Sequence, residues 1–167
     1  MKASAFTYHD PKTLDALFGL MSTLENCRLL AGGQSLMPML NMRFVLPDHV
    51  IDLNRVEGLS YIKEAGGALE IGAMTRQRDI EFSPDIARAC PVVQRALAHV
   101  GHRQTRNRGT IGGSLCHLDP SAELPLVAVA FDATVSIASL GHTRSLRMAE
   151  FAADMMAPAI ESDEVVT

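Results

Sequence analysis

Apolar positions in the first third of the chain follow first a helical and then a strand pattern. Through residues 11–26, Leu14, Leu17, Phe18 and Met21 recur every three or four positions, which predicts an amphipathic helix. Asp10 followed by a proline is typical of an N-cap and first helical turn, so we expect the helix to begin there. Short apolar runs at residues 28–31 and 50–53 predict buried strands, with a short helix opening at residue 35 between them. The pattern predicts a small α/β lobe over residues 1–54.

The pattern changes after residue 54 and favours hairpins and helices. Alternating residues around Gly66 and Gly67 predict a β-hairpin, and a second is expected around Gly141. Helices are predicted over residues 84–100, 121–131 and 148–155, with Pro91 breaking or kinking the first. The predicted class is α+β, with the second lobe spanning residues 55–167 and built mainly of antiparallel sheet and flanking helices.

The last seven residues resemble a turn that enters a new apolar strand at Val165. A strand of two residues is a poor place for a domain to end. We therefore expect this sequence to be a fragment of a longer chain.

Composition and charge exclude several classes of protein. The 167 residues are 47% hydrophobic and carry 15 basic and 19 acidic side chains, a net charge of −4. This balance indicates a globular core and argues against nonspecific binding to nucleic acid or insertion into a membrane. The three cysteines (Cys27, Cys90 and Cys116) are too scattered for a disulfide framework or a metal set. We expect reduced thiols and a cytoplasmic protein.

Two stretches that each contain a glycine pair are the main candidates for ligand binding. The first glycine loop consists of Ala31, Gly32, Gly33, Gln34 and Ser35, and the second glycine stretch of Thr110, Ile111, Gly112, Gly113 and Ser114. Each joins a glycine pair to a small hydroxyl residue, and glycines let a backbone approach a dense anion such as a diphosphate. The first loop also lies at the junction of a strand and an expected helix, where free backbone N–H groups favour an anion. Each on its own is also typical of a tight turn. Neither matches the P-loop or the dinucleotide fingerprint of nicotinamide enzymes.

Charged residues surround the second glycine stretch. Asp119 and Glu123 lie on one side of the expected helix start, where a carboxylate can accept hydrogen bonds from sugar hydroxyls. Asp119 fits a helix cap equally well, and His117 fits an ordinary hydrogen-bonded histidine. Three arginines precede the stretch and would either neutralise a diphosphate or brace the loop: Arg103, Arg106 and Arg108. No catalytic triad, metal motif or acid–base carboxylate pair stands out, so we expect no catalytic side chain and a bound cofactor that supplies the chemistry.

The two glycine stretches, continued by residues 119–125, resemble the flavin (medium) subunit of molybdenum hydroxylases, the xanthine dehydrogenase and aerobic carbon monoxide dehydrogenase family. The resemblance runs from the first residues to Thr167. It implies a two-lobed FAD-binding fold of the vanillyl-alcohol-oxidase type, without the C-terminal domain of full-length members. It also implies that the two stretches bind the FAD diphosphate, that Glu123, with Asp119 as a second candidate, binds its sugar hydroxyls, and that adenine rests near Val165.

The same resemblance implies an oxidoreductase subunit that transfers electrons. Electrons would reach its FAD from [2Fe–2S] clusters on a small partner subunit and leave to an external acceptor. The molybdenum cofactor would be bound by a large partner subunit, giving a heterotrimer. Two alternatives remain: a cofactor-free docking or structural remnant of such a subunit, and a module that binds a mononucleotide. The missing P-loop lysine counts against the second of these.

Overall fold

A three-stranded parallel sheet is built from the first third of the chain. The structure is a computed structural model that describes residues 1–167. The first elements are β1 (Thr7–His9), α1 (Leu14–Thr23), β2 (Cys27–Leu30), α2 (Leu36–Asn41), β3 (His49–Asp52) and the 3-10 turn η1 (Leu53–Arg55). The strand order is β1-β3-β2, so β2 is an edge strand. Its free edge is available to line a ligand site.

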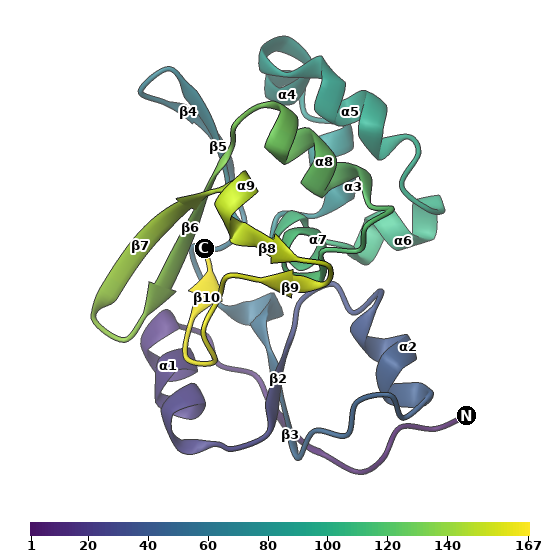
Figure 1. The fold of residues 1–167 in the computed structure, drawn as a ribbon, viewed down its shortest axis with the longest axis vertical. Coiled ribbons are helices and arrows are strands. Elements are labelled where there is room, and N and C mark those ends of the chain that lie inside the picture. The colour runs from purple at the N-terminus through teal and green to yellow at the C-terminus, as the bar shows by residue number, and fades with distance from the viewer.

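A hairpin and a group of short helices make up the middle of the chain. The hairpin pairs β4 (Ile62–Ala65) with β5 (Ala68–Ile71) around two glycines with positive φ. The helices are α3 (Gln77–Glu81), α4 (Pro84–Ala89), α5 (Pro91–Leu97), α6 (Arg103–Arg108), α7 (Ile111–His117) and α8 (Glu123–Ala130). Figure 1 shows these helices at the end of the molecule opposite the parallel sheet. None of the helices is both long and apolar enough to cross a bilayer.

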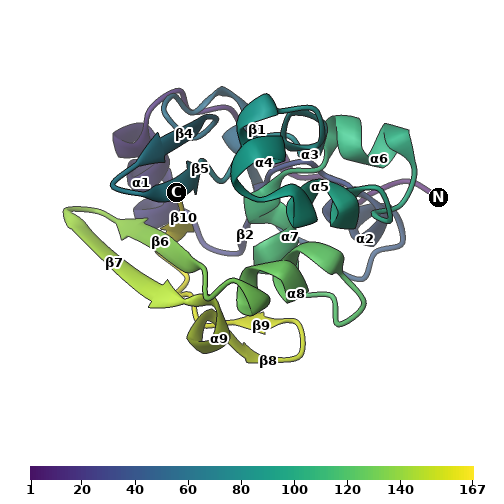
Figure 2. The same cartoon turned by 90° about the horizontal axis from the view of Figure 1, so that it is seen from above.

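An antiparallel sheet and a small hairpin complete the fold. They comprise β6 (Thr134–Ser139), β7 (His142–Arg147), α9 (Met148–Phe151), β8 (Ala152–Asp154), β9 (Ala157–Pro158) and β10 (Val165–Val166). The sheet order is β10-β6-β7, so the last strand of the chain is paired on one edge. Seen from above, β6 and β7 lie to one side of the helices, with β8 and β9 beneath α8 (Figure 2).

The hydrophobic core is divided among three clusters. The largest joins α1 and β3, through Phe18 and Ile51, to Met74, Ala138 and Val165 from later parts of the chain. Because this cluster contains residues from both sides of Asn54, packing alone does not divide the molecule there. The boundary between residues 1–54 and 55–167 therefore stays a prediction.

Most expected elements are present, and the mixed helices and sheets confirm the α+β class. The β4–β5 and β6–β7 hairpins, the break at Pro91 and the strand at Val165 are confirmed. The expected N-cap at Asp10 is wrong, because Thr13 caps α1 by accepting the N–H of Ala16 at 3.2 Å and Asp10 pairs with Arg55. The helix expected over residues 148–155 ends early, because β8 pairs with β9.

Candidate functional site

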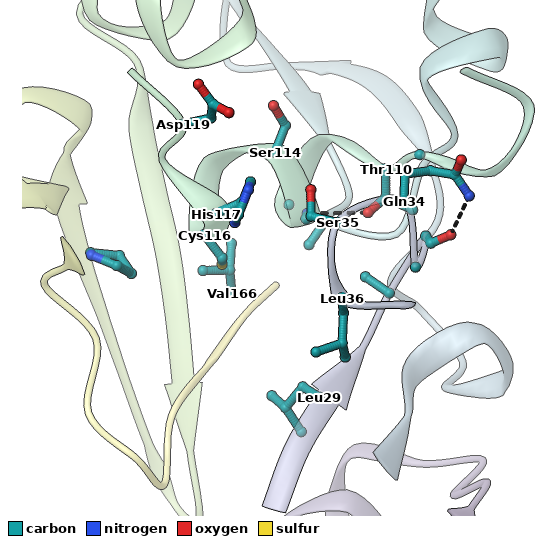
Figure 3. A pocket seen from close by; sticks show the side chains of 18 of the residues that line it. Leu29, Gln34, Ser35, Leu36, Thr110, Ser114, Cys116, His117, Asp119 and Val166 are labelled. Atoms are coloured by element: carbon teal, nitrogen blue, oxygen red, sulfur yellow. Dashed lines mark hydrogen bonds between the residues drawn. The ribbon is translucent and has the colours of Figure 1, made fainter. Parts of the chain in front are cut away.

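One large cavity of about 960 Å³ lies where the N-terminal sheet, the helices and the C-terminal segment meet. Its walls are β2 with the first glycine loop, the exposed face of α7, and residues 156–166. Figure 3 shows Leu29, Ser35 and Leu36 on one side, and Ser114, His117 and Asp119 on the other. The cavity therefore brings together the two stretches that the sequence singled out.

The first glycine loop presents unused backbone donors to this cavity. None of the N–H groups of residues 32–35 donates to another protein group. Gly33 has a φ of 72°, the left-handed region that glycine adopts without strain. Ser35, the N-cap of α2, makes no side-chain capping bond. Four successive donors without partners at a cavity wall are suited to an anion with several oxygens.

The second glycine stretch differs, because its N–H groups are already bonded within the protein. Thr110 is the N-cap of α7, and its Oγ1 accepts the N–H of Gly113 at 3.1 Å. The N–H groups of Ile111 and Gly112 donate to the carbonyls of Thr75 and Ala73, at 3.2 and 2.8 Å. The expected free loop is thus the first turn of a helix. Sequence reasoning missed α7 because two glycines are unusual inside a helix.

The first glycine of each pair lies where another backbone segment passes close by. A Cβ on Gly32 would overlap the Arg108 carbonyl oxygen, and one on Gly112 would lie 2.8 Å from that of Ala73. The first glycine of each pair therefore permits a close crossing of two backbone segments. This is a packing requirement, separate from any approach by a ligand.

A network of polar side chains links the first glycine loop to Arg108, just before the second glycine stretch. Asn54 donates from Nδ2 to the Ala31 carbonyl at 3.0 Å. Arg76 donates to the Asn54 side-chain oxygen and to the carbonyl of Arg108. Burial lowers the pKa of Arg76, and the neighbouring Arg108 lowers it further. This network fixes the first glycine loop against the turn that leads into α7.

The two candidate carboxylates have different surroundings. Asp119 accepts the hydroxyl and the N–H of Ser121, at 2.6 and 2.8 Å, and these bonds lower its pKa. Glu123 begins α8, is half-buried at the cavity wall and makes no hydrogen bond or ion pair within the protein. Asp119 therefore closes a local turn, whereas Glu123 retains a free carboxylate.

An ion pair anchors the C-terminal wall of the cavity. Arg144 on β7 contacts both carboxylate oxygens of Glu164 at 2.6 Å, and it also donates to the Ala159 carbonyl at 2.8 Å. The hydrogen bond from Arg144 is the main cause that lowers the pKa of Glu164 to about 2. The pair holds residues 159–164 beside the start of β10.

All the predicted site residues line the cavity except Ile111, whose side chain packs into two hydrophobic clusters. None of Arg103, Arg106 and Arg108 lines it. Arg106 instead pairs with Glu81 at 2.8 Å and so fixes α6; the two side chains are 12% and 16% exposed.

His117 has no hydrogen bond to the protein and faces the cavity. If the helix had been predicted, the spacing of three residues would have placed His117 on the same face as Ser114.

Two further lining residues were not singled out from the sequence. Gln77 is buried, and its Oε1 has no hydrogen-bond partner in the protein. Cys116 has its thiol pKa raised to about 12 by burial, so it is a neutral group in the wall. The cavity wall therefore contains an unsatisfied amide, and the Cys116 thiol in it is not a reactive thiolate.

Comparison with known proteins shows relatives along the whole chain. A family model described as the FAD binding domain in molybdopterin dehydrogenase matches residues 4–167. The nicotine 6-hydroxylase medium subunit of Paenarthrobacter nicotinovorans is 36% identical, covering 100% of this chain and 59% of that protein. The carbon monoxide dehydrogenase medium chain of Hydrogenophaga pseudoflava is 35% identical, covering 96% and 56%.

A solved structure of a related enzyme has the same fold over nearly the whole chain. The crystal structure of quinoline 2-oxidoreductase from Pseudomonas putida 86 superposes with a TM-score of 0.97 at 37% identity, covering 99% of this chain and 58% of that one. The chain thus spans somewhat more than half the length of the proteins that it matches.

Proposed function

Because the chain belongs to the family of FAD-binding domains in molybdopterin dehydrogenases, we propose that the cavity between the first glycine loop and α7 is its FAD site. The observation that carries this proposal is the row of free N–H groups over residues 32–35 at the cavity wall. A diphosphate has several oxygens that each require donors. The family also confirms the predicted FAD-binding fold.

The residues present fit such a cofactor. A cavity of about 960 Å³ has the volume of a site for a large organic ligand. We assign the N–H groups of residues 32–35 to the diphosphate and the free carboxylate of Glu123 to sugar hydroxyls. Ser35 and Ser114 contribute hydroxyls from opposite walls (Figure 3).

The second glycine stretch has a supporting role in this proposal. Thr110, Gly112 and Gly113 build the first turn of α7 and place its exposed face opposite the donors of the first glycine loop. Asp119 orients the turn into α8 and so places Glu123. Residues 164–166 close the cavity on the side that we assign to adenine.

We further propose that the chain is the flavin part of a larger oxidoreductase complex. The relatives are called medium subunits or medium chains, which is consistent with assembly with other subunits. In this proposal a small iron–sulfur subunit and a large molybdenum subunit are the partners. Bound FAD supplies redox chemistry between their centres and an external acceptor, while the residues of this chain bind and orient it.

Binding of FAD by the purified chain tests the proposal. We expect flavin absorbance to remain with the protein after gel filtration in the presence of FAD. FMN and ADP, titrated separately, should each bind more weakly than FAD, because each lacks part of the molecule. A colourless chain that takes up no FAD would contradict the proposal and favour the cofactor-free docking role. Equal affinity for FMN would favour the mononucleotide alternative.

A further inference from the structure

The exposed face of α7 carries a polar stripe that ends in an imidazole. Residues spaced by three or four positions share one face of a helix. On α7 the face that lines the cavity includes Thr110, Gly113, Ser114 and His117. Ile111, Leu115 and Leu118 pack into hydrophobic clusters on the other side. His117 is therefore held at the cavity wall by the same helix that carries the second glycine stretch.

His117 has no competing partner within the protein. Its imidazole is half-buried and makes no hydrogen bond to another protein group. Of the six histidines in the chain, it alone lines the cavity. Figure 3 shows it on α7 beside Cys116, one turn beyond Ser114. Both ring nitrogens are thus available to a ligand or to solvent.

The charged groups around His117 are mainly acidic. Asp119 and Glu123 follow it along the chain, and Glu161 and Glu164 line the C-terminal wall, where Glu164 is paired with Arg144. The neighbouring strand β9 contributes no charged side chain. Arg28, on β2, is the one lysine or arginine that lines the cavity, and it donates to the Cys27 carbonyl at 3.0 Å.

A diphosphate placed in this cavity would therefore add negative charge where fixed cations are scarce. An anion close to an imidazole favours the protonated form of that imidazole and raises its pKa. Linkage is reciprocal, so a protonated imidazole also binds the anion more tightly. Histidine is the side chain that most readily exchanges a proton between pH 5 and 8, so a coupling of this kind can be measured near neutral pH.

We propose that His117 takes up a proton when FAD binds and, as an imidazolium, donates a hydrogen bond to a phosphate oxygen of the cofactor. The proton comes from the buffer, and no covalent bond changes. This inference rests on the proposed function. It predicts that the affinity for FAD falls as the pH rises through the range in which free histidine titrates, by up to about tenfold per pH unit for one coupled proton.

The test measures the FAD dissociation constant between pH 5.5 and 8.5 by quenching of flavin fluorescence. Wild type should lose affinity with rising pH, and His117→Gln should give a nearly flat profile. His99→Gln, which changes an exposed histidine outside the cavity, is the matched control and should behave as wild type. The affinity for ADP, measured by calorimetry, should also decrease in His117→Gln. The affinity for riboflavin, which has no phosphate, should be the same in His117→Gln as in wild type.

Calorimetry of the wild type in two buffers of different ionisation enthalpy gives a second measurement that needs no variant. We expect uptake of up to one proton for each FAD bound near neutral pH. No uptake, or an unchanged pH profile in His117→Gln, would overturn the role of His117 while leaving the FAD site intact. Failure of the wild type to bind FAD at any pH would overturn the proposed function and this inference together.

Discussion

The two glycine stretches look alike in sequence but use their backbones in opposite ways. In the first glycine loop, the N–H groups of residues 32–35 have no partner in the protein. In the second glycine stretch, the N–H groups of residues 111–114 are bonded to Thr75, Ala73 and Thr110. One stretch thus leaves its donors free at the cavity, and the other uses them to fasten a helix.

The difference shows that a glycine pair in a sequence indicates close backbone packing and is not sufficient evidence for a ligand. Gly32 and Gly112 each permit one backbone segment to cross another, and neither position has room for a Cβ. Only the hydrogen bonds of the neighbouring residues distinguish a ligand loop from a helix start. The polar side chains around the cavity divide in the same way, since Asp119 and Glu164 are bonded within the protein whereas Glu123 and His117 are not.

The largest expected effect comes from forcing the first glycine loop away from the backbone at Arg108. In Gly32→Ala the new Cβ would overlap the Arg108 carbonyl oxygen, so the two backbone segments must separate. We expect the free energy of unfolding to fall by about 3 kcal/mol, as in overpacked cores, and FAD binding to be lost. Urea denaturation and flavin titration measure both.

Gly19→Ala is the matched control for that change. Gly19 lies within α1 with open space around its Cα, and alanine favours helix by about 1 kcal/mol. The control should therefore be as stable as wild type or more stable, with unchanged FAD affinity. If Gly32→Ala had the same stability and FAD affinity as Gly19→Ala, the close backbone contact at Gly32 would not be needed for folding or for FAD binding.

The next effect separates the free carboxylate from the bonded one. Glu123→Ala should weaken FAD binding by about 2 kcal/mol, because an acceptor for sugar hydroxyls is lost, and it should leave stability nearly unchanged. Asp119→Ala should instead lower the free energy of unfolding by about 1 kcal/mol, since the hydrogen bonds from Ser121 disappear. Equal FAD affinity in Glu123→Ala and wild type would remove Glu123 from the site.

A smaller effect is expected from the two hydroxyl residues that begin α2 and α7. Thr110→Val removes the cap of α7 and should cost about 1 kcal/mol of stability, because the Gly113 N–H loses its acceptor. Ser35→Ala removes no capping bond and should be neutral for stability while weakening FAD binding. Thermal melts of both variants without FAD test this contrast, and similar losses in the two would contradict it.

Sequence reasoning could predict the elements whose signals are local. The hairpin around Gly66 and Gly67 and the break at Pro91 follow from the conformational preferences of glycine and proline. It could also predict which stretches gather at the cavity, since every assigned site residue except Ile111 lines it. It could not predict α7 as a helix, because the partners that satisfy its first N–H groups, Ala73 and Thr75, lie far along the chain.

The smallest expected effect concerns the C-terminal wall of the cavity, where the contribution of Glu164 to stability is lost in acid. The pKa of Glu164 is lowered from 4.5 to about 2 in the folded chain, mainly by the hydrogen bond from Arg144. A carboxyl group with a depressed folded pKa stabilises the fold above its unfolded pKa. That contribution should be intact above pH 4.5 and should diminish as the pH falls from 4.5 towards 2. Because the Arg144 end of the pair is partly exposed, solvent screening keeps the effect modest.

Urea midpoints at pH 6, 4.5 and 3, compared between wild type and Glu164→Gln, isolate this contribution. Glutamine keeps the shape but cannot titrate, so the gap in stability between the two proteins should narrow as the solution is acidified. A gap that stays constant down to pH 3 would mean that the ion pair does not fasten this wall. If the stability gap narrows and Glu164→Gln also binds FAD more weakly at neutral pH, the ion pair between Arg144 and Glu164 helps to shape the cavity opposite the free N–H groups of residues 32–35.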